Sequence, residues 1–149
     1  MRIAFLVRAL SVGGAERQLT LLATGLAARG HQVAVLVFYR GGPLEDEMVS
    51  AGVTIVDLAK SGRWDVAGFG ARLWRYLRSE RPEVVYSFLP SANVLSATMG
   101  FLLPRLRFVM GVRSTEMNYD KRDGLGRIAA AIEGRLATRA AALICNSYS

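Results

Sequence analysis

The chain has few of the side chains that most often carry catalytic or cross-linking chemistry. Its 149 residues include one cysteine, Cys145, and one histidine, His31. A single cysteine cannot form a disulfide within the chain, which fits a reducing compartment. A single histidine excludes a histidine-rich metal site, and we expect no metal and no cofactor.

The chain also has no long apolar run. The longest such stretch, residues 94–110, is interrupted by Pro104, Arg105 and Arg107 and falls short of the roughly 20 apolar residues that span a membrane. The first seven residues hold too short an apolar segment for a signal peptide. We therefore expect a cytoplasmic protein.

Two glycine signatures of nucleotide binding are missing. The chain has no G-x-G-x-x-G after its first apolar run, which weakens a dehydrogenase interpretation, and no Gly-Lys-Ser/Thr ending of a P-loop. Positive charge, in contrast, is abundant, because the chain has 19 Lys and Arg residues and 12 Asp and Glu residues, which give a net charge of +7. Such a surface favours anionic partners. The aromatic residues do not alternate with the cations as stacking platforms would require, so nucleic acid is not expected.

Strand-like and helix-like patterns alternate along the whole chain. Six apolar or β-branched runs read as strands, and the segments between them carry helical periodicity. The strands are predicted at 2–7, 31–38, 53–58, 82–89, 106–112 and 142–146, and the helices at 14–30, 41–52, 65–82, 91–102 and 127–140. The pattern predicts a doubly wound, Rossmann-like parallel sheet of about six strands, covered by helices on both faces.

Ligands of such sheets bind outside the carboxyl ends of the strands. At the first of these ends, Gly13 and Gly14 precede a long helix. Glycines there let an anion approach the free N–H groups of a helix N-terminus, although they could equally serve only the turn. Glu16 suits the dipole of that helix. His31 stands at the start of a strand, at the opposite edge, where a structural role is expected.

Several segments together resemble the N-terminal lobe of a family 4 glycosyltransferase of the GT-B fold. They are "GGAER" followed by "RGHQVAVL", then "RPEVVYSFLPSANVL", "FVMGVRST" and the closing "ALICNS". The resemblance covers essentially the whole chain, residues 1–149. It implies a retaining transferase that moves a sugar from a nucleotide-sugar to a glycan, lipid-linked or small-molecule acceptor. It also implies that a C-terminal donor-binding lobe is missing from this chain, which would leave the lobe inactive alone.

Site residues are expected at three strand ends, from the resemblance for Gly13 and Gly14 and from their residue types for the others. Gly13, Gly14, Arg17 and Arg113 would face the donor diphosphate and the acceptor. Ser87, Ser91, Asn93, Ser114 and Glu116 would contact acceptor hydroxyls. Some relatives have histidines at Arg113 and near Ser87, and this chain has none there. From the residues alone, Arg113 could instead pair with Glu116 or Asp120, and Ser91 could be a helix N-cap. Arg17 could be a surface residue or could reach the cleft.

Two further interpretations remain open. A peripheral membrane contact could be made by three aromatic residues and the cations beside them: Trp64, Phe69, Trp74, Arg63, Arg72, Arg75 and Arg78. The segment could instead be an ordinary amphipathic helix with a solvated basic face. The chain could also be a stand-alone Rossmann-like module that binds nucleotides or anions without catalysis. A nucleotide-sugar donor, the acceptor and the chain's own C-terminal lobe are the expected partners.

Overall fold

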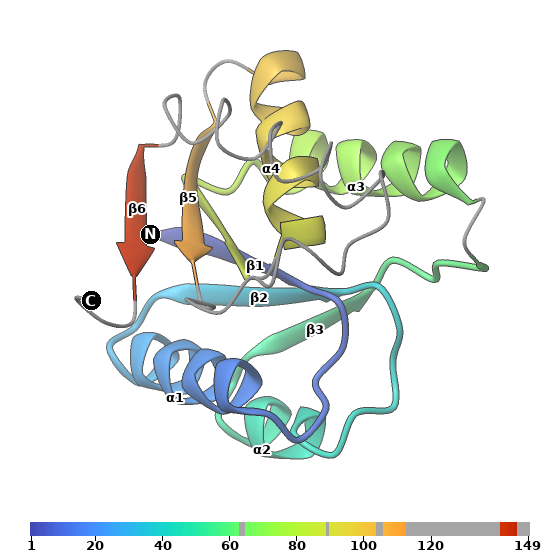
Figure 1. The fold of residues 1–149 in the computed structure, drawn as a ribbon. Helices are drawn as coiled ribbons and strands as arrows, with labels where there is room; N and C mark the ends of the chain where they lie inside the picture. Colours follow the sequence, from blue (N-terminus) through green and yellow to red (C-terminus); the bar gives the residue numbers. More distant parts are fainter. Residues whose placement is uncertain (63–64, 89, 104–105, 113–140, 146–149) are drawn as a thin grey trace.

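Six parallel strands form one sheet at the centre of the molecule (Figure 1). The computed structural model describes residues 1–62, 65–88, 90–103, 106–112 and 141–145. The elements are β1 (Arg2–Val7), α1 (Gly14–Ala28), β2 (Gln32–Val37), α2 (Glu45–Ser50), β3 (Thr54–Asp57), α3 (Val66–Glu80), β4 (Val84–Phe88), α4 (Pro90–Leu102), β5 (Arg107–Val112) and β6 (Ala142–Cys145). The predicted helix at 127–140 lies outside the described residues.

The strand order is β3-β2-β1-β4-β5-β6, and every pair is parallel. The order reverses direction between β1 and β4, which are neighbours in the sheet although β2 and β3 lie between them in the chain.

 β1 pairs with β4 from Ile3–Val84 to Leu6–Ser87. A change of direction between two central strands defines the switch point of a doubly wound sheet. The predicted fold class is therefore confirmed.

Side chains alternate between the two faces of the sheet, and each face has its own buried core. Phe5 and Val35 lie on the face covered by α1 and α2, whereas Leu6 and Leu36 lie on the face covered by α3 and α4 (Figure 1). Both faces are apolar because helices exclude water from both, as expected for a parallel sheet.

The helices bury residues at helical spacing, and two apolar residues next to these stripes are exposed. Leu19 and Ala23 of α1 are fully buried, but Leu22 is 37% exposed because it lies at the margin of that stripe. Val66, the first residue of α3, is exposed and lies outside the core cluster of that face. Gly30 ends α1 with a φ of +81°, a conformation that favours glycine.

Candidate functional site

The carboxyl ends of the strands meet at one edge of the sheet. Val7 of β1 pairs in register with Val37 of β2, which pairs with Asp57 of β3. β4 ends at Phe88, beside the same edge. The loop that leaves β1 therefore starts at the switch point and leads to the N-terminus of α1, where ligands of doubly wound sheets bind.

The loop after β1 is braced by the loop after β2. Phe38 N donates hydrogen bonds to the carbonyl oxygens of Val7 at 3.3 Å and Arg8 at 3.1 Å. Leu44 N donates to Leu10 O at 3.4 Å. Gly42 packs so closely on the backbone of Leu10 that a Cβ there would overlap its carbonyl group. This contact explains why residue 42, in the loop after β2, is a glycine. It also fixes the position of the loop after β1.

Glu45 holds the second loop in shape, a role that the sequence did not reveal. Its carboxylate is almost fully buried and accepts hydrogen bonds from Gly41 N at 2.8 Å and Gly42 N at 3.2 Å. Arg40 Nε lies 3.2 Å from the other carboxylate oxygen. The only hint in the sequence was an acidic residue three positions after a Gly-Gly pair.

Gly13 and Gly14 lie at the start of α1, and neither is required there by its backbone conformation. Gly13 is the N-cap, with extended φ and ψ of −155° and 161°, and no side chain caps the helix. A Cβ on Gly14 would meet no heavy atom within 4 Å, and one on Gly13 would meet only the flexible end of Glu16. The turn alone therefore does not explain the glycine pair.

Two charged side chains flank this helix N-terminus. The carboxylate of Glu16 folds back beside Gly13. Arg17, predicted to face the donor diphosphate, instead forms an ion pair with Glu47 of α2, with 2.5 Å between Nη1 and Oε2. Both partners are about half exposed, so the pair is accessible to solvent.

Ser87 and Asn93, predicted to contact the acceptor, are fully buried. Ser87 Oγ donates to Asn93 Oδ1 at 2.7 Å, and Asn93 Nδ2 donates to Gly111 O at 3.3 Å. These bonds connect β4, α4 and β5 behind the site. The sheet and α4 enclose both side chains, and direct contact with an acceptor stays a prediction.

The other predicted acceptor residues are less fully described. Ser91 is the second residue of α4, which begins at Pro90, so Ser91 is not its N-cap. β5 ends at Val112, immediately before Arg113. Arg113, Ser114 and Glu116 lie outside the described residues, and their role stays a prediction.

The loop after β3 is held by an ion pair between Asp65 and Arg72. Arg72 Nε also donates to Leu58 O at 2.7 Å, and Asp65 Oδ1 caps α3 by accepting from Phe69 N at 3.2 Å. The Ser61 N–H and the Arg72 guanidinium lower the pKa of the Asp65 carboxyl below its ordinary value. No group of three or more potential metal ligands occurs within the described segments.

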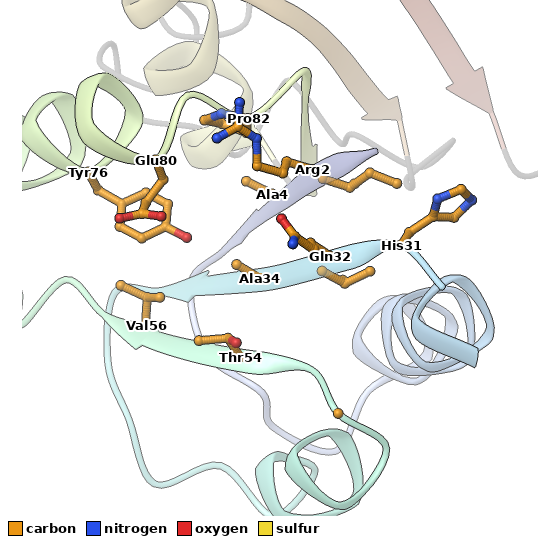
Figure 2. A pocket seen from close by; sticks show the side chains of 13 residues that line it. Arg2, Ala4, His31, Gln32, Ala34, Thr54, Val56, Tyr76, Glu80 and Pro82 are labelled. Atoms are coloured by element: carbon orange, nitrogen blue, oxygen red, sulfur yellow. The ribbon is translucent and has the colours of Figure 1, made fainter. Parts of the chain in front are cut away.

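A hollow of about 550 Å³ opens at the opposite, amino edge of the sheet (Figure 2). It is lined by residues at the starts of β1 and β2, by β3 and by the last turns of α3. His31 lies on its rim. The hollow is thus separate from the carboxyl edge, where doubly wound sheets bind their ligands.

The sheet order, the helices on both faces and the open helix N-terminus at the switch point define a Rossmann-like α/β domain. In sequence, residues 12–149 match Glycosyltransferase Family 4, and the chain belongs to this family. No curated protein matches the chain significantly.

Solved structures show the same fold. Anabaena HepE in complex with UDP-glucose matches with a TM-score of 0.78 and 20% identity over 99% of this chain. Acinetobacter baumannii MurG matches with a TM-score of 0.62 and 14% identity over the whole chain. The chain covers 38% of the HepE chain and 43% of the MurG chain, so it spans less than half the length of either protein.

Proposed function

We propose that the chain is the N-terminal, acceptor-side lobe of a retaining glycosyltransferase. The transferase would move a sugar from a nucleotide-sugar to a glycan, lipid-linked or small-molecule acceptor. Membership of Glycosyltransferase Family 4 supports the reaction class, and the UDP-glucose complex of HepE supports the type of donor. The observation that carries the proposal is the glycine pair at the open N-terminus of α1.

The N-terminus of α1 can stabilise the departing diphosphate. Arg17 N makes the first bond of the helix, to Gly13 O at 2.9 Å, so the N–H groups of residues 14–16 precede the helical ladder. Together with the helix dipole they favour a nearby anion. Charge that develops on a leaving diphosphate would be stabilised there without a metal ion. Before a phosphate could reach these N–H groups, the carboxylate of Glu16 would have to turn away from Gly13.

The remaining partners belong to the same proposal. A C-terminal lobe would hold most of the nucleotide-sugar and close the cleft over Gly13 and Gly14. Ser87 and Asn93 would position the segment after β5 instead of touching the acceptor, because both are buried. Arg113, which follows β5, would bind an anionic group of donor or acceptor.

A peripheral membrane contact would involve the outer face of α3. Arg78 lies over the ring of Trp74, 5.2 Å from its centroid, and Arg75 is exposed beside them. The described residues contain no helix long and apolar enough to cross a membrane. An amphipathic helix packed on a sheet has the same features, and binding to anionic lipid vesicles distinguishes the two interpretations.

The proposal is tested by titrating the chain with UDP and UDP-glucose while following backbone amide shifts. We expect shifts at Gly13 and Gly14 that Gly14→Leu removes, since a side chain there would block the approach of phosphate. Gly25→Leu is the matched control, because Gly25 is an exposed glycine of the same helix that also has no neighbour within 4 Å.

Both variants should raise the free energy of unfolding by about 0.5–1 kcal/mol, because leucine favours helix over glycine. Unchanged amides at Gly13 and Gly14, or equal UDP affinities of the two variants, would contradict the proposed site.

A further inference from the structure

The hollow at the amino edge exists because three neighbouring strands carry small side chains in one row. Ala4, Ala34 and Thr54 are partners in register across β1, β2 and β3. The next row consists of the larger Leu6, Leu36 and Val56. Above the row of small residues, Tyr76 and Glu80 project from α3 toward the strands (Figure 2). The two alanines therefore make the middle of the floor apolar, and Thr54 adds a hydroxyl at its edge.

The rim of the hollow is polar and nearly balanced in charge. Arg2 and Gln32 are partners in register at its outer end, and Glu80 stands across from them on α3 (Figure 2). Thr54 and Tyr76 add hydroxyl groups. Burial of Tyr76 and the charge of Glu80 raise the pKa of the phenol, so it stays protonated and can donate a hydrogen bond. Hydrogen-bond donors and acceptors thus surround an apolar floor.

We infer that this hollow binds a short, uncharged saccharide. A sugar ring combines an apolar C–H face with hydroxyl groups that both donate and accept, which matches the floor and the rim. The volume of about 550 Å³ falls within the range of small-ligand sites. A phosphate would gain little here, because the carboxylate of Glu80 opposes the single guanidinium of Arg2.

This site lies apart from the proposed catalytic edge. A strand of six residues rises about 20 Å, so a saccharide in the hollow would not reach Gly13. The inference goes beyond the proposed transferase function and does not depend on it. In a transferase that acts on a glycan, the hollow would hold a sugar distant from the reacting end.

The test is a titration of the chain with maltose, cellobiose and N,N′-diacetylchitobiose, followed by backbone amide shifts. We expect at least one disaccharide to shift the amides of Gly52 and Thr54, which line the hollow. Tyr76→Phe and Glu80→Gln should each weaken binding about three- to tenfold, because the first removes a hydroxyl and the second replaces a charged acceptor oxygen with an amide nitrogen that only donates. Ala34→Leu should abolish binding by filling the hollow.

Ala67→Leu is the control for Ala34→Leu, since Ala67 lies on the exposed face of α3. No binding of any of the three disaccharides, or binding that survives Ala34→Leu, would overturn the inference. If circular dichroism shows that Ala34→Leu does not fold, full affinity of Tyr76→Phe and Glu80→Gln would overturn it instead. UDP is titrated into the same samples to separate the two proposals. Absence of UDP-induced shifts at Gly14 would contradict the proposed function and would leave the proposal for the hollow unaffected.

Discussion

At the scale of single residues, an arginine that already pairs with a carboxylate must exchange partners to bind a phosphate. Arg17 is in this position, since Glu47 of α2 holds its guanidinium. The pair is exposed, and such pairs contribute little to stability, typically under about 1 kcal/mol. Exchange of Glu47 for a diphosphate as the partner of Arg17 would therefore cost little free energy.

We predict that Arg17→Ala weakens UDP binding and that Glu47→Gln leaves it unchanged or strengthens it, because the second variant frees the guanidinium. Each should lower the free energy of unfolding by less than about 1 kcal/mol. Calorimetric titration with UDP and urea denaturation measure the two effects. UDP affinity that is the same in Arg17→Ala as in the parent chain would remove Arg17 from the site.

Asp65 gives a pH-dependent prediction. Its pKa is lowered in the folded chain, so on acidification the unfolded chain takes up a proton first. The stabilisation by Asp65 is therefore present above about pH 4 and is lost as the pH falls further. Asp65→Asn should lower the free energy of unfolding at neutral pH. It should also make the loss of stability between neutral and acidic pH smaller, as measured by the midpoints of urea denaturation.

The control for this measurement is Asp46→Asn, which changes an exposed carboxylate on α2. The same acid decline in Asp65→Asn as in the parent chain would show that Asp65 does not contribute to it.

The sequence predicted individual site residues only in part. It located Gly13 and Gly14 correctly at a strand exit, because strand and helix patterns meet there. It could not show that Ser87 and Asn93 bond to each other, since their enclosure depends on how α4 packs on β4 and β5. Nor could it pair Arg17 with Glu47, which lies 30 positions away.

At the scale of elements, α4 is attached to the sheet by a polar contact inside an apolar core. Asn93 connects this helix to Ser87 of β4 and to the carbonyl of Gly111 in β5. A buried carbonyl that loses its donor costs stability, so the contact fixes how the helix sits on the two strands. The exit of β5 toward Arg113 depends on this arrangement.

We predict that Asn93→Ala lowers the free energy of unfolding by about 1–3 kcal/mol, because it leaves buried polar groups without a partner. Ser87→Ala should cost less, and the two changes should not be additive. Ser96→Ala is the control, since its buried hydroxyl has no hydrogen-bond partner in the described structure. Additive effects of Asn93→Ala and Ser87→Ala in urea denaturation would contradict a coupled pair.

At the scale of the whole molecule, periodicity predicted the alternation of strands and helices and the doubly wound class. The positions of the described elements agree with it to within a few residues. The hollow at the amino edge could not be predicted, because it depends on the register of three strands that are separate in sequence. Residues 113–126 and the predicted helix at 127–140 lie outside the described residues.

We predict that the 149-residue chain binds UDP but transfers no sugar, because one lobe cannot enclose the donor. The measurement is release of UDP and formation of a glycosylated product from UDP-glucose and an added acceptor. A full-length protein with both lobes is the positive control. Efficient transfer by the 149-residue chain would overturn this prediction.

The central place of β1 also matters for how the chain folds. β1 is the first strand to be synthesised, yet it needs β2 on one side and β4 on the other. Its edge toward β4 stays unpaired until Phe88 has been made, and unpaired edges invite contacts with other chains. Pairings between strands so distant in sequence also form slowly. The newly made chain is therefore most prone to aggregate before β4 joins the sheet.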